Sequence, residues 1–169
     1  IFVIGFYNNL VALRNQVANA WSQIDVQLKR RHDLIPNLVE TAKGYMQHER
    51  GTLEAVTNAR SQAIGAKSVG EAAKAEGVLG QALSKFLLTV EAYPDLKANQ
   101  NFLYLQEELS STENKIAFSR QAYNDQVLFY NNKIQMFPSN IIAGMFNFTQ
   151  KEFFQIENAA EKFVPKVSF

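Results

Sequence analysis

The chain has 169 residues, of which 47% are hydrophobic and 20% are charged, so it can bury the core of one ordinary domain. Its net charge of +1 argues against a dedicated nucleic-acid binder, whose affinity comes mainly from neutralising phosphates. The chain has no cysteine, which excludes a disulfide scaffold, a thiolate metal site and a cysteine nucleophile.

The first six residues, Ile1 to Phe6, are apolar except for Gly5. A helix that crosses a bilayer needs about 20 apolar residues, so this stretch cannot span one alone. Two interpretations stay open: the start of a buried helix, or the remnant of an N-terminal membrane anchor. Under the second, residues 1–6 belong to the anchor and residues 7–169 form a single helical-bundle domain. The protein would then be a single-pass membrane protein with most of its chain soluble, on a side of the membrane left open.

Apolar residues spaced three or four positions apart predict helices along most of the chain. The first predicted helix covers residues 6–31. We expect a second helix from Asp33 to Ala63, because Asp33 is a plausible N-cap and Pro36 fits a first helical turn.

A third helix is predicted after Ser68, since Ser68 and Glu71 have the spacing of a capping box. The dipeptide Tyr93-Pro94 predicts a turn, and the fourth helix is expected over residues 99–137. Every seventh residue of the fourth helix is apolar, which is typical of coiled-coil-like packing. These residues are Phe102, Leu109, Ile116, Tyr123, Tyr130 and Phe137.

The second apolar seam of the fourth helix is interrupted by Thr112, Ser119 and Arg120. These polar residues indicate either a partly exposed, loosely packed layer or a functional polar patch.

Seven of the 13 phenylalanines fall at or after Phe137. We expect residues 141–149 to be irregular, residues 150–162 to form a short amphipathic helix and residues 164–169 to form an extended tail. The phenylalanines either plug the end of the bundle or contact a membrane surface.

Four helices with short connections predict an all-α fold. The expected architecture is an elongated up-and-down antiparallel four-helix bundle with a short C-terminal helix and an extended tail. In it the first and fourth helices are antiparallel neighbours, so Trp21 should be largely buried against the fourth helix.

No catalytic, cofactor or metal site is predicted. Neither His32 nor His48 has a carboxylate three or four positions away, as a metal site within a bundle needs. The chain contains no phosphate-binding loop, dinucleotide fingerprint or nucleophile elbow. The acidic residues Glu107, Glu108 and Glu113 are interpreted as a solvated helix face.

Two polar patterns remain as candidate sites. The basic run Lys29-Arg30-Arg31-His32 is either a favourable cationic end of the first helix or a docking patch for an acidic partner or anionic lipid.

The second pattern is the dipeptide Tyr-Asn, which occurs at positions 7, 123 and 130 although asparagine is a poor helix former. Antiparallel packing places Asn8 near Asn131 and Asn15 near Asn124. These asparagines either face solvent or form an interhelical polar layer that fixes the register.

Several long motifs resemble the LemA family across essentially the whole chain. They are the segments 7–15, AWSQIDVQLKRRHDLIPNLV at 20–39, EAYPDLK at 91–97, TENKI at 112–116, RQAYN at 120–124 and FPSN at 137–140. The resemblance implies a bacterial-type membrane protein with a short N-terminal anchor and a helical bundle of the class grouped with bromodomain-like bundles. It implies no established enzyme activity.

The leading hypothesis is therefore a non-catalytic, membrane-tethered interaction or scaffold protein at the cell membrane. Its partner would be a membrane protein, a quality-control protease or another copy of itself. The alternative is a binding module with a small-ligand or peptide groove between helices, and an enzyme comes third.

Overall fold

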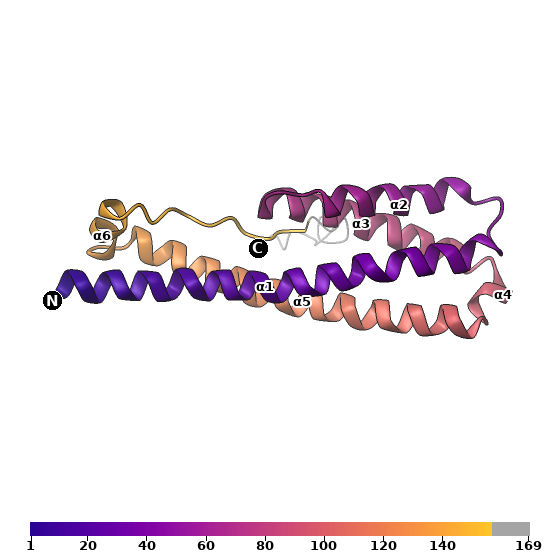
Figure 1. Ribbon diagram of the computed structural model, residues 1–169, viewed down its shortest axis with the longest axis horizontal. Coiled ribbons are helices and arrows are strands. Elements are labelled where there is room, and N and C mark those ends of the chain that lie inside the picture. The colour runs from indigo at the N-terminus through magenta and orange to yellow at the C-terminus, as the bar shows by residue number, and fades with distance from the viewer. Residues whose placement is uncertain (157–169) are drawn as a thin grey trace, which may run out of the picture. The chain divides into compact units, whose positions relative to one another are not determined.

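The computed structural model describes residues 1–156, which form helices and no strand (Figure 1). The predicted all-α helical-bundle class is confirmed. The predicted tail at 164–169 lies outside the described residues. The helices are α1 (Phe2–Lys43), α2 (Arg50–Ile64), α3 (Val69–Val90), α4 (Pro94–Lys97), α5 (Gln100–Gln135) and α6 (Ser139–Met145).

The chain divides into two compact units, and α1 and α5 contribute to both. Unit 1 comprises residues 1–33 and 108–154, and unit 2 comprises residues 34–107 and the chain from residue 155. The boundary of a single domain at residues 7–169 stays a prediction.

Unit 1 pairs the first part of α1 with the second part of α5 in antiparallel directions. Trp21 of α1 contacts Tyr123 of α5, whereas Arg31 contacts Glu113, so the residue numbers run in opposite directions. The chain then passes through α6 and returns as an extended segment (Figure 1). The core of the helix pair includes Leu10, Val17, Ile24, Ile116, Val127 and Tyr130.

The helix predicted at residues 150–162 is wrong for residues 150–156, which are not helical. Residues 157–162 lie outside the described residues. Side chains of α5 bind the backbone of this segment, so its peptide groups have partners without helical hydrogen bonds.

The predicted helix break at His32-Asp33 is also wrong, because α1 continues to Lys43 and contains Pro36. An internal proline costs a helix about 3 kcal/mol. The apolar stripe continues past it through Ile35, Leu38 and Ala42, all buried, and burying such side chains recovers more than that cost. The chain leaves the helix at Gly44 instead.

Unit 2 packs the last turns of α1, the helices α2, α3 and α4, and the first turns of α5. The rings of Phe86 in α3 and Phe102 in α5 lie 6.3 Å apart and are fully buried. Ser68 caps α3 as predicted, since its hydroxyl accepts a 3.1 Å hydrogen bond from the Glu71 N–H. The turn predicted at Tyr93-Pro94 is followed by α4, which begins at Pro94.

The seven-residue repeat of α5 is buried from Phe102 to Tyr130, but Phe137 is exposed because α5 ends at Gln135. Thr112 is fully buried, and its hydroxyl donates a 2.8 Å hydrogen bond to the Glu108 carbonyl. The interpretation of a loosely packed layer is therefore wrong for Thr112, whereas Ser119 and Arg120 are partly exposed.

Residues 141–149 were expected to be irregular, yet residues 141–145 belong to the helix α6. Ser139, Ile142 and Ala143 are buried on one side of this helix, so packing stabilises a turn of helix that the sequence pattern does not reveal.

Candidate functional site

Unit 1 binds its own extended segment through two asparagines of α5. Asn131 Nδ2 donates to the Lys151 carbonyl at 3.0 Å, and the Lys151 N–H donates to Asn131 Oδ1 at 2.9 Å. Asn124 makes the same pair of bonds with the backbone of Phe154, at 3.0 and 2.9 Å. Each side-chain amide thus pairs with one residue's N–H and C=O as a neighbouring strand would.

The tyrosines that precede these asparagines bind the same segment. Tyr123 Oη donates to the Glu152 carbonyl at 2.8 Å, and Tyr130 Oη donates to the Thr149 carbonyl at 2.9 Å. We call Tyr123, Asn124, Tyr130 and Asn131 the Tyr–Asn clamp.

The spacing of the clamp matches the segment that it binds. Seven residues of α-helix rise about 10.5 Å. Three residues of extended chain cover about 10 Å, so Lys151 and Phe154 meet asparagines seven positions apart. The repeated Tyr-Asn dipeptide is therefore a backbone-binding device in register with the extended segment.

The predicted interhelical polar layer is wrong. The amide groups of Asn124 and Asn131 bind the extended segment, whereas Asn8 and Asn15 are exposed on α1. The seven-residue spacing of Tyr-Asn was the signal for the clamp. Its partner was missed because residues 150–156 were expected to be helical.

Trp21 of α1 packs against one clamp residue and against the extended segment. Its ring lies 5.5 Å from the ring of Tyr123 and 5.5 Å from that of Phe154, in tilted and edge-on arrangements. The predicted contact with the fourth long helix is present, but Trp21 is only partly buried, and its contact with Phe154 was not anticipated.

We expect Tyr123 of the clamp to make the free energy of unfolding fall as the pH becomes alkaline. Burial, and secondly the negative charge of Glu152, raise the pKa of Tyr123 from 10.0 to about 12. Because the folded pKa is above the unfolded one, the neutral phenol stabilises the fold below pH 10, and this contribution is lost as the pH rises towards 12. Urea unfolding across this range should show a steeper fall for the parent chain than for Tyr123→Phe. Equal slopes would contradict this role of Tyr123.

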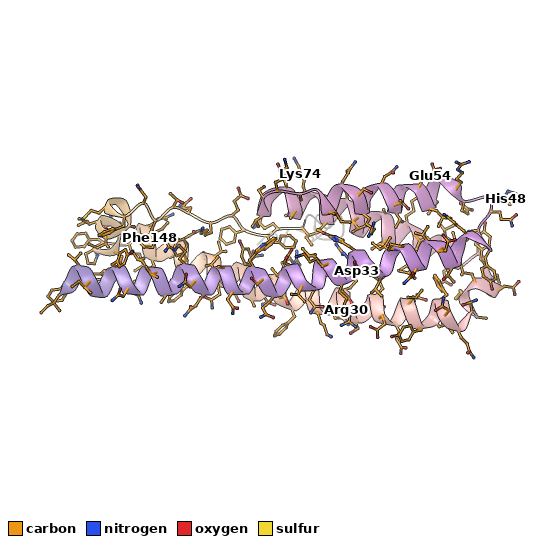
Figure 2. The ribbon with its side chains drawn as sticks, in the orientation of Figure 1. Arg30, Asp33, His48, Glu54, Lys74 and Phe148 are labelled. Atoms are coloured by element: carbon orange, nitrogen blue, oxygen red, sulfur yellow. The ribbon has the colours of Figure 1, made fainter. Side chains whose placement is uncertain are left out.

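The basic run lies inside α1, not at a helix end, and its side chains have different environments. Arg31 is 2% exposed, and its Nη1 donates to both carboxylate oxygens of Glu113, at 2.8 and 3.0 Å. Arg30, labelled in Figure 2, forms an ion pair with Glu108 of α5. Lys29 pairs with Asp25 at 2.9 Å.

Two interpretations of this run are therefore corrected. It is not the cationic end of a helix, because α1 continues to Lys43. Arg31 and His32 are buried, so the four residues do not form one continuous docking patch. Glu108 and Glu113 are partners of these arginines and not simply a solvated face.

One end of unit 1 exposes a group of large apolar side chains. The rings of Phe146 and Phe148 lie 4.7 and 5.8 Å from the ring of Tyr7, which brings α6 beside the start of α1 (Figure 1). We call this region the apolar end of unit 1. Its exposed residues are Ile1, Phe2, Val3, Ile4, Met136, Phe137, Ile141, Met145 and Phe146.

Of the phenylalanines from residue 137 onwards that the structure describes, two are buried, two are exposed and Phe153 is partly exposed. Phe148 (labelled in Figure 2) and Phe154 are buried, as expected of a plug. The Arg14 guanidinium lies 4.9 Å from the centre of the Phe148 ring. Phe137 and Phe146 are exposed.

Two shallow cavities are lined by described residues of unit 2. One of about 440 Å³ is lined by α3 and Gln155, and one of about 430 Å³ lies between the end of α1 and the start of α2. Among residues 1–156 there is no group of three or more histidine, aspartate or glutamate side chains placed to hold a metal ion.

Comparison with known proteins identifies the family. The sequence pattern of the LemA family matches residues 20–169. The chain belongs to the LemA family. The matched LemA region contains Arg31, Glu113 and the whole Tyr–Asn clamp, whereas Tyr7 and the first turns of α1 precede it.

Two relatives illustrate how far the similarity extends. Protein LemA of Metamycoplasma hominis is 29% identical over 145 residues, which cover 83% of this chain and 64% of the relative. Magnetosome protein MamQ 2 of Paramagnetospirillum magneticum is 24% identical over 181 residues, which cover 92% and 66%. The LemA-family chain described here thus spans about two thirds of the length of these relatives. None of its helices within residues 1–156 combines the length and apolarity needed to cross a membrane.

Proposed function

We propose that this LemA-family chain is a non-catalytic, membrane-tethered interaction module whose membrane contact is the start of α1. The observation that carries this proposal is the exposure of four consecutive apolar side chains, Ile1 to Ile4, by 47–106%. Exposed apolar clusters mark surfaces that another apolar phase covers. A bilayer is an apolar phase that fits these exposed side chains.

The polar groups of unit 1 support a structural role over a catalytic one. The arginines at 30 and 31 pair with carboxylates, and the clamp side chains bind backbone groups. A catalytic site needs a nucleophile, a base and an orienting group that converge on free space. The described hydrogen bonds and ion pairs instead hold elements of unit 1 to one another.

Two exposed aromatic rings on α5 support a protein contact as part of this proposal. Phe118 and Phe129 are 78% and 61% exposed and lie eleven positions apart, which is about three helical turns. They therefore lie on one face of the helix. Aromatic side chains of this kind anchor protein interfaces, so this face is where we place a membrane-protein, protease or self contact.

The second candidate is a groove for an extended peptide. It is favoured by the clamp, whose side chains form hydrogen bonds with backbone groups of residues 149–154 and not with their side chains. Exchange of a labelled peptide of residues 147–156 into the whole chain would favour this candidate over the first.

Vesicle binding tests the membrane contact. We expect the chain to sediment with lipid vesicles, and the double variant Phe2→Ser, Ile4→Ser to bind at least about tenfold more weakly because two apolar side chains no longer enter the lipid. Phe118→Ser, which removes an exposed ring elsewhere in unit 1, is the matched control and should bind like the parent. Equal binding of the double variant and the control would overturn the proposed tether.

A further inference from the structure

We infer that α6 is a second membrane contact, which lies on the surface of an anionic bilayer beside the start of α1. The inference extends the proposed function, since it assigns the lipid class and a second binding element. It depends on three observations: the faces of α6, its position and the charge of its surroundings.

The helix α6 is apolar on the side that packs and on the side that does not. Ile142 and Ala143 are buried, whereas Ile141 and Met145 are 53% and 64% exposed. The segment 139–145 contains no charged residue. A short uncharged helix with apolar side chains on both its buried and its exposed side is typical of an element covered twice, by the protein and by a second apolar phase, although Asn140 is also exposed on α6.

The position of α6 puts its exposed side chains near the tether. Phe146, directly after α6, is 47% exposed while its ring also contacts Tyr7 of α1. Tyr7 lies one turn after the exposed residues 1–4. Figure 1 shows α6 beside the first turns of α1, so one bilayer surface can cover both.

Within residues 1–156, the part that the structure describes, the two stretches that form this end of unit 1 contain no carboxylate side chain. Residues 1–24 and 126–151 contain none of the 16 acidic residues of the chain, although an even distribution would place several there. The same stretches contain three basic residues, Arg14, Lys133 and Lys151. The acid-free part of α1 extends about 25 Å from Tyr7. Any carboxylate farther along α1 is therefore more than one Debye length, about 8 Å at physiological salt, from Tyr7, and its charge is largely screened there.

This charge pattern selects an anionic bilayer as the occupant. A surface with three cations and no carboxylate attracts negatively charged lipid headgroups. A second copy would bring the same positive surface against the first, which opposes self-association through this end. An apolar face formed by stretches whose charged side chains are all basic therefore fits anionic lipid better than it fits another copy of the chain.

Vesicle binding of the whole chain, with phosphatidylcholine and with mixed phosphatidylcholine and phosphatidylglycerol, tests the inference. The double variant Ile141→Ser, Met145→Ser changes only exposed side chains, so its thermal unfolding should match that of the parent. We expect it to bind mixed vesicles about tenfold more weakly. The double variant Lys133→Gln, Lys151→Gln should lose about tenfold on mixed vesicles only.

The outcomes separate this inference from the proposed tether. Phe118→Ser is again the matched control. If the α6 variant binds mixed vesicles like the parent while Phe2→Ser, Ile4→Ser does not, the tether stands and the inference fails. The inference is also overturned if the parent self-associates in solution while the α6 variant is monomeric. In that case α6 contacts a second copy of the chain. Equal binding of the parent to both vesicle types would overturn the anionic preference.

Discussion

Replacing Glu113 by alanine is expected to lower the free energy of unfolding by about 2 kcal/mol. Both oxygens of this carboxylate accept hydrogen bonds from Arg31, whose guanidinium is 2% exposed. The Glu113 side chain is 41% exposed, so its removal deletes two charge-assisted hydrogen bonds to a buried guanidinium and lets water reach the remaining groups, which costs more than the loss of an exposed ion pair. Urea unfolding measures the loss, and an unchanged m-value would show that both states keep their exposed area.

Glu108→Ala is the matched control for this prediction. It removes the ion pair with Arg30, whose side chain is 42% exposed, so the expected loss is below about 1 kcal/mol. Equal losses for the two variants would show that burial of Arg31 has no energetic consequence.

Replacing Trp21 by alanine is expected to destabilise unit 1 by about 3 kcal/mol. The indole ring touches Tyr123 and Phe154, so its removal leaves a gap between α1, α5 and the extended segment. The value lies at the lower end of the range for tryptophan because the side chain is only partly buried. Chemical unfolding followed by circular dichroism gives the measurement, since the chain has no other tryptophan to report by fluorescence.

Phe118→Ala provides the comparison, because it removes a ring that is 78% exposed and should change stability by no more than about 0.5 kcal/mol. A loss below about 1 kcal/mol for Trp21→Ala would contradict the packing role of the indole.

Most helices follow from apolar periodicity, because burial of a stripe dominates their stability. The predicted helix boundary at Asp33 was wrong for the same reason. A capping residue and a proline are local signals worth about 1–3 kcal/mol, and the stripe through Ile35 and Leu38 outweighs them. The capping box at Ser68 was predicted correctly because no apolar stripe continues across Gly65, which precedes it.

The candidate site was only half predictable. The Tyr-Asn repeat marked the correct residues of α5, since its seven-residue spacing keeps side chains on one helix face. Its partner is a backbone segment without a side-chain pattern, and backbone groups carry no sequence signal. The burial of Arg31 could not be predicted either, because the sequence of a basic run does not show whether its side chains pair with carboxylates or face water.

The most direct measurement of the central claim, that the apolar end of unit 1 lies on an anionic bilayer, is tryptophan emission from α6. Met145→Trp in a Trp21→Phe background places one reporter at a side chain that is 64% exposed. Phe118→Trp in the same background is the control on α5. On adding mixed phosphatidylcholine and phosphatidylglycerol vesicles, the account predicts a shift to shorter wavelength and quenching by brominated lipid for the reporter at 145, and neither change for the reporter at 118. Solvent-like emission from both reporters in the presence of these vesicles would contradict the claim.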